Sequence, residues 1–86
     1  MKVRVFSVFD KKARLYNPPV FFVTLGQALR WFGDLLSDKA QLTGKHPEDF
    51  ELVAVAEFDD ESAVFGDVDH VRYDAGALAG MDGSVP

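Results

Sequence analysis

Residues 44–60 read GKHPEDFELVAVAEFDD, and the nine residues FELVAVAEF at 50–58 decide the fold. Alternate side chains of an extended strand point to opposite faces, which places five apolar residues on one face: Phe50, Leu52, Ala54, Ala56 and Phe58. The other face carries Val53 and Val55 between two glutamates, so the middle of the segment is apolar on both sides. Such a strand is typical of the centre of a sheet, where both faces are covered.

The preceding residues, 45–49, contain three side chains that can bind metals: His46, Glu48 and Asp49. A metal needs three or four convergent ligands, whereas consecutive loop residues are expected to diverge. Pro47 cannot continue a helix and donates no amide, and the two acidic residues suit a tight turn. We interpret the segment as a joint that delivers the following strand.

The first half of the chain predicts strands around one helix. Residues 2–9, KVRVFSVF, form a strand with Val3 and Val5 on its better buried face. A turn at 10–12 leads to a short return segment at 13–17, and the prolines at 18–19 confine this part to a sheet edge. An extended run follows at 20–23.

A capping box at Thr24 and Gln27 predicts that a helix begins there. Apolar residues then recur at three- and four-residue spacing through about residue 40, which indicates an amphipathic helix; they are Leu25, Ala28, Leu29, Phe32, Leu35 and Leu36. After the central strand, 63–65 and 68–73 are candidate edge strands. The predicted architecture is α+β, with one amphipathic helix packed on a small, mainly antiparallel sheet of three to five strands.

Length and composition indicate one domain. The chain has 86 residues, 48% of them hydrophobic, and no cysteine, which excludes disulfides and thiolate zinc sites. We expect a single domain at 1–73 and a flexible C-terminal tail at 74–86, where small residues offer little to bury. The N-terminus has charges among its apolar residues and no continuous apolar stretch, so neither a signal peptide nor a membrane span is expected.

Charge divides the chain in two. Residues 1–45 have a net charge of +5 and residues 46–86 a net charge of −10, within a total of −5. A chain of this kind can present a positive face to polyanions, or pair head to tail with a second copy. It can also use the two charges merely to solvate opposite surfaces.

No catalytic pattern is present in the sequence. The serines and threonines lie in no nucleophile-elbow setting, and there is no glycine-rich phosphate loop. If residues 67–70 formed a strand, alternating side chains could hold a metal; the candidate ligands are Asp67, Asp69 and His70. An exposed acidic edge strand explains these residues equally well. We therefore expect a protein that is not an enzyme and that needs no metal or cofactor.

Cations and aromatic residues are interleaved in the first half. Single-stranded nucleic acid is bound by cations that follow the phosphates and by rings on which bases stack. Phe6 is one candidate for stacking, although most rings of so small a domain should form its core. The candidate nucleic-acid-binding residues are Lys2, Arg4, Lys11, Lys12, Arg14, Tyr16, Arg30 and Trp31.

Several blocks of residues resemble a known family. They are Lys-x-x-x-Phe-Ser-Val-x-Asp-x-Lys-Ala at 2–13, Pro-x-Phe-Phe at 19–22, Gly-x-Ala-x-Arg-x-Phe at 26–32, Gly-Lys-His-Pro-Glu-Asp-Phe-x-Leu at 44–52 and Glu-Phe-Asp-Asp at 57–60. Over about residues 2–62 the chain resembles the small non-structural protein of gokushovirus-type microviruses, bacteriophages with single-stranded DNA genomes. The resemblance implies a role in phage DNA replication or packaging in the host bacterial cytoplasm, and it assigns no functional residues.

Resemblance and charge pattern together lead to one expectation: a non-enzymatic phage protein that binds single-stranded DNA, acting as a homodimer. The alternative is a scaffold or adaptor whose acidic half binds a capsid protein or a host replication protein.

Overall fold

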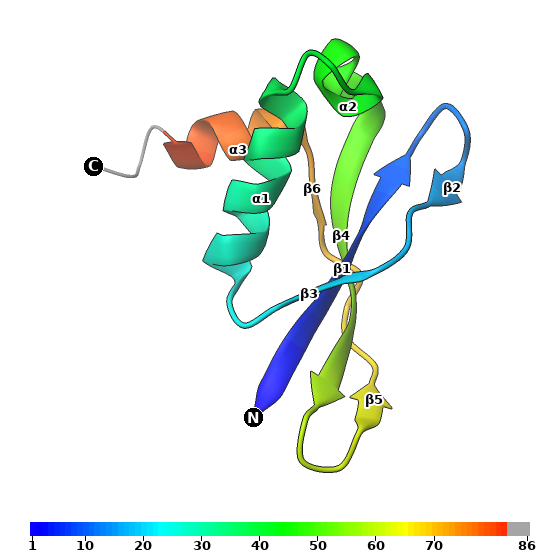
Figure 1. The fold of residues 1–86 in the computed structure, drawn as a ribbon, viewed down its shortest axis with the longest axis vertical. Helices are drawn as coiled ribbons and strands as arrows, with labels where there is room; N and C mark the ends of the chain where they lie inside the picture. The colour runs from blue at the N-terminus through cyan, green and yellow to red at the C-terminus, as the bar shows by residue number, and fades with distance from the viewer. Residues whose placement is uncertain (83–86) are drawn as a thin grey trace.

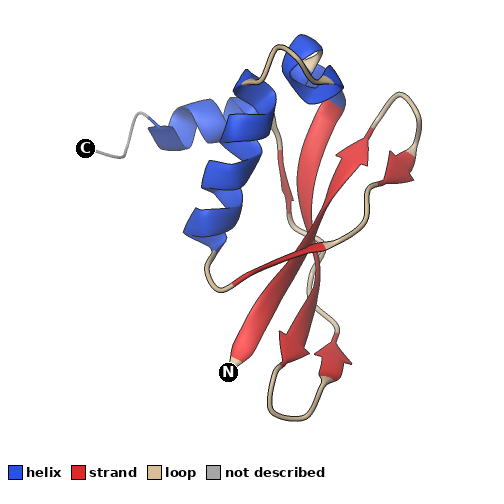
Figure 2. Cartoon of the chain, viewed as in Figure 1, coloured by secondary structure: helices blue, strands red, loops and turns tan. Residues whose placement is uncertain are grey.

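The computed structural model describes residues 1–82, and side chains through Leu78. Its elements in chain order are β1 (Lys2–Asp10), β2 (Leu15–Tyr16), β3 (Val20–Phe22), α1 (Leu25–Ser37), α2 (Leu42–Lys45), the 3-10 helix η1 (Pro47–Asp49), β4 (Phe50–Asp59), β5 (Val64–Gly66), β6 (Arg72–Tyr73) and α3 (Ala75–Asp82). The helices lie on one side of a twisted sheet (Figures 1 and 2). The predicted α+β architecture is confirmed. The sheet has six strands, one more than the largest number predicted.

Strands β1 and β4 form the centre of the sheet. They pair antiparallel from Lys2 opposite Asp59 to Asp10 opposite Phe50. Strands β2 and β3 both pair with β1, and β5 and β6 both pair with β4, so each edge consists of two short pieces. The double proline between β2 and β3 interrupts the sheet edge beside β1, because proline has no amide to donate to the ladder. The predicted central position of β4 and edge positions of the short segments are confirmed.

Helix α1 begins at the predicted capping box. The Thr24 hydroxyl accepts a hydrogen bond from the Gln27 amide at 3.2 Å, and the Gln27 side chain accepts one from the Val23 amide at 3.2 Å. The apolar stripe of the helix packs on the sheet and forms the core together with strand residues; the cluster comprises Phe6, Val8, Ala28, Leu29, Phe32, Leu36, Phe50 and Leu52. Burial of such side chains contributes about 1.5–3 kcal/mol each for the larger ones.

A β-bulge decides which side chains face the helix. The pairing of β1 with β4 shifts between Val5 and Phe6, which leaves Val55 as an extra residue in β4. On the helix side Phe6 and Val8 are each 1% exposed. The prediction that Val3 and Val5 are better buried than Lys2 and Arg4 is confirmed, since Val5 is 2% exposed and Val3 is half-buried, although α1 packs on the opposite face of β1.

We call the side of the sheet away from α1 the open face. From β1 it receives the odd-numbered side chains, since Phe6 and Val8 point to the helix. Beyond the bulge Phe58 also lies there, because it pairs with Val3. The expectation that Phe50 and Phe58 share one face was wrong for the same reason: the extra residue reverses the alternation.

The joint between α1 and β4 is tightly packed. A side chain on Gly44 would place its Cβ 1.9 Å from the Asp38 carbonyl oxygen, so only glycine fits there. The Thr43 hydroxyl donates to the Leu35 carbonyl at 2.9 Å. Pro47 opens η1, which leads directly into β4. Residues 45–49 thus deliver β4, as the interpretation of this segment as a joint predicts.

The C-terminal segment contains a helix where a flexible tail was expected. The Asp74 carboxylate accepts a hydrogen bond from the Ala77 amide at 2.7 Å, which caps the start of α3. Leu78 lies against α1, where a Cβ on Gly33 would be 3.3 Å from its Cδ2 atom. The remainder of the predicted tail, 83–86, lies outside the described residues. Over the described part of the chain, every helix is too short or too polar to cross a membrane.

Candidate nucleic-acid interface

The turn between β1 and β2 concentrates positive charge. Its four residues are Lys11, Lys12, Ala13 and Arg14, and all of them are exposed. The Asp10 carboxylate accepts hydrogen bonds from the amides of Lys12 at 2.9 Å and Ala13 at 3.1 Å. Arg14 closes the turn with a φ of 61°, and its amide donates to the Asp10 carbonyl at 2.7 Å. The turn thus projects three cations from one end of the sheet, at the upper right of Figure 1.

These three cations have no ion-pair partner within the part of the chain that the structure describes. The nearest carboxylate in sequence, that of Asp10, is engaged by backbone amides. The side chains of Lys11, Lys12 and Arg14 therefore keep their charge available to a ligand.

An aromatic pair lies directly beside the turn, on the open face. The rings of Phe9 and Tyr16 are 4.6 Å apart, and Tyr16 is 46% exposed. The guanidinium of Arg72 lies 5.1 Å from the Phe9 ring and 5.8 Å from the Tyr16 ring. It donates to the Tyr16 hydroxyl at 2.5 Å and to the Glu51 carboxylate at 3.2 Å.

Arg72 is the residue of this site that sequence reasoning missed. Its hydrogen bond to Tyr16, and then the hydrogen bond to Glu51, raise the pKa of Arg72 above its usual value. Arg72 is the sole cation of residues 46–86, and that isolation was the available signal. The sequence did not reveal this contact because Arg72 and Tyr16 are 56 positions apart. The pairing of β6 with β4 brings them together.

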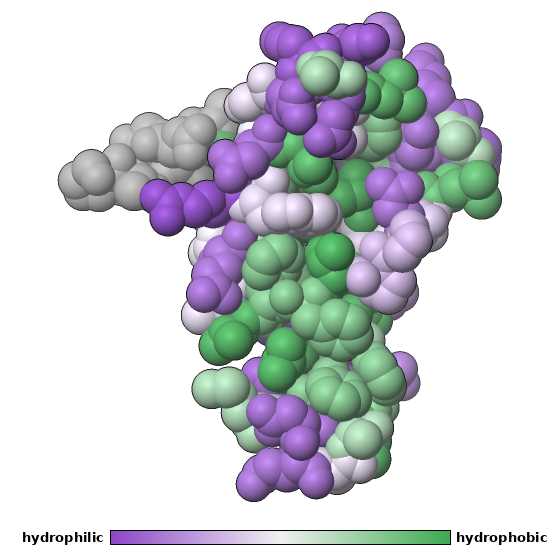
Figure 3. Space-filling model, viewed as in Figure 1, coloured by the Kyte–Doolittle hydropathy of each residue, from purple (hydrophilic) through white to green (hydrophobic). Residues whose placement is uncertain are grey.

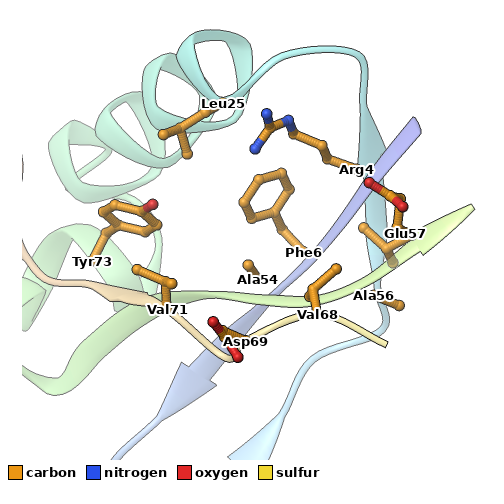
Figure 4. A pocket seen from close by; sticks show the side chains of 11 residues that line it. Arg4, Phe6, Leu25, Ala54, Ala56, Glu57, Val68, Asp69, Val71 and Tyr73 are labelled. Carbon is orange, nitrogen blue, oxygen red and sulfur yellow. The ribbon is translucent and has the colours of Figure 1, made fainter. Parts of the chain in front are cut away.

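Lys2 and Arg4 lie toward the other end of β1. Nine residues of strand separate Lys2 from Lys11, a distance of about 30 Å at roughly 3.3 Å per residue. The Lys2 ammonium lies 3.6 Å from the Glu57 carboxylate. Arg4 lines a cavity of about 220 Å³ beside Phe6 and Leu25, and its guanidinium extends over the Phe6 ring toward Leu25 (Figure 4).

The remaining predicted residues are separate from the turn. Phe6, predicted as a stacking ring, is buried in the core at 1% exposure, so that prediction was wrong. Its position opposite α1 follows from the strand alternation. Trp31 is half-buried and packs against Phe22 with the rings 5.6 Å apart, while Arg30 is exposed on α1. The structure therefore brings together four of the predicted residues, Lys11, Lys12, Arg14 and Tyr16. The other four lie elsewhere: Arg30 and Trp31 on α1, and Lys2 and Arg4 along β1.

The two candidate metal clusters differ from expectation. The ligand atoms of His46, Glu48 and Asp49 lie within 4.8 Å of one another, because η1 folds the three residues back. The prediction that these side chains diverge was wrong. All three groups are exposed or half-buried at the surface, where acidic groups commonly gather without an ion. Asp67 and Asp69 lie in an irregular connection and not in a strand, so the alternation proposed for them does not occur.

The fold and the site define a small α+β protein with a cationic and aromatic surface at one end of its sheet. The comparison with protein families matches residues 3–73 to the Phage ORF5 protein family, and the chain belongs to that family. Protein ORF5 of Chlamydia phage 1 is 33% identical over 73 residues, covering 80% of this chain and 76% of that protein. The resemblance to a small protein of gokushovirus-type microviruses is confirmed. No solved structure matches.

Proposed function

We propose that this phage protein binds single-stranded DNA, without catalysing a reaction, during replication or packaging of the viral genome in the host cytoplasm. The observation that carries the proposal is the surface formed by three unpaired cations of the β1–β2 turn and the adjoining Tyr16 ring, among the described residues. Family membership supports it only by placing the chain in a phage.

The arrangement suits a flexible single strand. Lys11, Lys12 and Arg14 would bind successive phosphates, because a turn that projects three cations can follow a bent backbone. Tyr16 would stack on a base, an interaction worth about 1–3 kcal/mol. Arg72 holds the Tyr16 hydroxyl and fixes the ring for that contact. The other predicted residues would contribute only where the DNA extends beyond this surface; they are Lys2, Arg4, Arg30 and Trp31.

A titration of the protein with a labelled oligothymidine, followed by fluorescence polarisation, tests the proposal. Each phosphate contact of a single strand contributes about 0.7 to the slope of log affinity against log salt. Replacing Lys11, Lys12 and Arg14 together with glutamine should therefore lower that slope by about 2, and lower the affinity at least tenfold at about 50 mM salt.

A matched variant gives the control. Arg30→Gln removes one exposed cation from α1, which lies apart from the turn (Figure 1). Its effect should stay below that of any single replacement in the turn. Binding that is absent in the wild-type chain, or unaffected by salt, would eliminate the proposal.

The alternative function is a scaffold or adaptor that binds a capsid or host replication protein through its acidic half. It is favoured by the other end of the sheet, where Asp60 and Glu61 adjoin exposed Val64 and Phe65. The two functions separate in the glutamine variant of the turn, since partner binding through the acidic end should survive that change.

A further inference from the structure

The open face carries an aromatic cluster that nothing in the described structure covers. Phe21 of β3, Phe58 of β4 and Phe65 of β5 lie with ring centroids 4.9 to 6.3 Å apart. Phe21 is 48% exposed and Phe65 is 59% exposed. Figure 3 shows apolar surface gathered over the lower half of the sheet, where β1, β3 and β4 cross. We call these three residues the aromatic cluster.

Two rings of the aromatic cluster, those of Phe58 and Phe65, belong to one of two equivalent hairpins. The sequences VFDKKARLY at 8–16 and EFDDESAVF at 57–65 align without a gap. In each hairpin an aspartate carbonyl accepts from the residue at φ 61° at 2.7 Å, from Arg14 in the first and from Ala63 in the second. Each strand pair also carries an aromatic pair, with ring centroids 4.6 Å apart in the first hairpin and 4.9 Å apart in the second.

The equivalent hairpins differ in charge and in cover. The first turn presents Lys11, Lys12 and Arg14, and a guanidinium lies over its aromatic pair. The second turn presents Asp60 and Glu61, with the amine of Met1 at 2.7 Å from Asp60. Over the described residues, no cation lies on the rings of Phe58 and Phe65. Among the described residues, therefore, the first hairpin has a cation over its aromatic pair and the second hairpin has none over the equivalent pair.

We propose that a second copy of this chain covers the open face in antiparallel orientation. The two turns lie at opposite ends of a molecule 39 Å long (Figure 1). An antiparallel partner therefore sets its cationic turn beside the acidic turn and the aromatic cluster, and receives the same contact in return. Such a two-fold arrangement satisfies both ends at once and closes as a dimer. Cations over aromatic rings and opposite charges across the contact both stabilise it.

Single-stranded DNA is a poorer occupant of the aromatic cluster. The carboxylates of Asp60 and Glu61 repel phosphates at its edge. The cationic turn, in contrast, would be shared between the acidic turn of a partner and DNA. Addition of an oligonucleotide should therefore shift dimer toward monomer by linkage. This last consequence rests on the proposed function, but the dimer itself does not.

Sedimentation equilibrium of the intact chain tests the dimer. At about 50 mM salt the mass should approach twice the chain mass of 9.5 kDa, and it should fall toward the monomer at about 500 mM salt, where surface charges are screened. Phe21→Ser with Phe65→Ser should weaken dimerisation at least tenfold. Leu42→Ser, which changes a side chain 58% exposed on α2, should leave it unchanged.

Charge exchange gives the second test and does not touch the apolar surface. Lys11→Glu with Lys12→Glu, and Asp60→Lys with Glu61→Lys, should each yield a monomer. An equimolar mixture of the two variants should form a one-to-one heterodimer, because both ends are then complementary again.

Several results would overturn the proposal. They are a wild-type chain that stays monomeric, serine variants that are folded by circular dichroism and still dimerise, and a mixture that fails to associate. Species that grow beyond a dimer would indicate an open head-to-tail chain instead. Loss of DNA affinity in the serine variants, without any change of mass, would assign the aromatic cluster to DNA. If the dimer forms but DNA does not bind, only the proposed function fails.

Discussion

Replacing Arg72 with alanine should destabilise the domain and disturb the site at the same time. The guanidinium makes three kinds of contact: with the Tyr16 hydroxyl, with the Glu51 carboxylate and with the two rings. A cation–π contact at an exposed site contributes about 0.5–1 kcal/mol. A hydrogen bond contributes about 1 kcal/mol, and an exposed ion pair contributes less than about 1 kcal/mol. Since Arg72 is 39% exposed, we expect a total loss of about 2 kcal/mol.

Urea unfolding measures this loss. Trp31 is the single tryptophan and packs against Phe22 at 5.6 Å, so its fluorescence reports on folding away from the mutated site. A loss of about 2 kcal/mol corresponds to a fall in Tm of about 10 °C for a domain of this size. Arg72→Lys keeps the charge but loses the planar group, and should recover less than half of the loss.

A double-mutant cycle isolates the contact with Tyr16. Tyr16→Phe removes the hydroxyl that accepts from Arg72 while keeping the ring. The two changes should be coupled by about 1 kcal/mol. An Arg72→Ala variant that loses less than about 0.5 kcal/mol, or a cycle without coupling, would show that Arg72 does not fix the Tyr16 ring.

Three further predictions concern the scaffold and its pH dependence. Gly44→Ala forces a Cβ against the Asp38 carbonyl at 1.9 Å, and chemical unfolding should show a loss of at least about 3 kcal/mol. Thr24→Ala removes the cap of α1 and should lower the free energy of unfolding by about 1 kcal/mol. The Glu61 amide lowers the pKa of Asp59 below 3.8, so its stabilisation is present above pH 3.8 and is lost as the pH falls through the folded value. In the Asp59→Asn variant, the free energy of unfolding measured during an acid titration should lack this pH-dependent contribution.

Much of the fold could be predicted from local patterns. The alternation of residues 50–58 identified the central strand, and the capping box with its apolar stripe identified α1. Both signals act within a few residues, where side-chain period and hydrogen-bonding capacity are fixed by the backbone.

The errors arose where longer-range geometry decides. The extra residue Val55 reverses the faces of β4, and no composition signal distinguishes a bulge from regular alternation. The contact of Arg72 with Tyr16 depends on the pairing of β6 with β4, which is set by two residues only. The equivalence of the hairpins 8–16 and 57–65 is also weak in sequence, because opposite charges occupy the same positions.

The candidate site was predicted in part. Lys11, Lys12, Arg14 and Tyr16 are gathered by one hairpin, so their proximity follows from sequence neighbourhood. Lys2 and Arg4 lie on the same strand, but its extended form carries them away from the turn. Cations that are close in sequence therefore formed one surface, and cations distributed along a strand did not.

DNA should bind at the cationic turn and the adjoining Tyr16 ring. Amide chemical shifts of the ¹⁵N-labelled protein, followed during titration with a short oligothymidine, show residue by residue where it binds. The largest changes should fall on residues 10–16 and on Arg72, with little change on residues 59–66 in the Phe21→Ser, Phe65→Ser variant, in which dimer dissociation contributes less. Largest changes on α1 or on the acidic hairpin, or no changes at all, would rule out binding at the cationic turn.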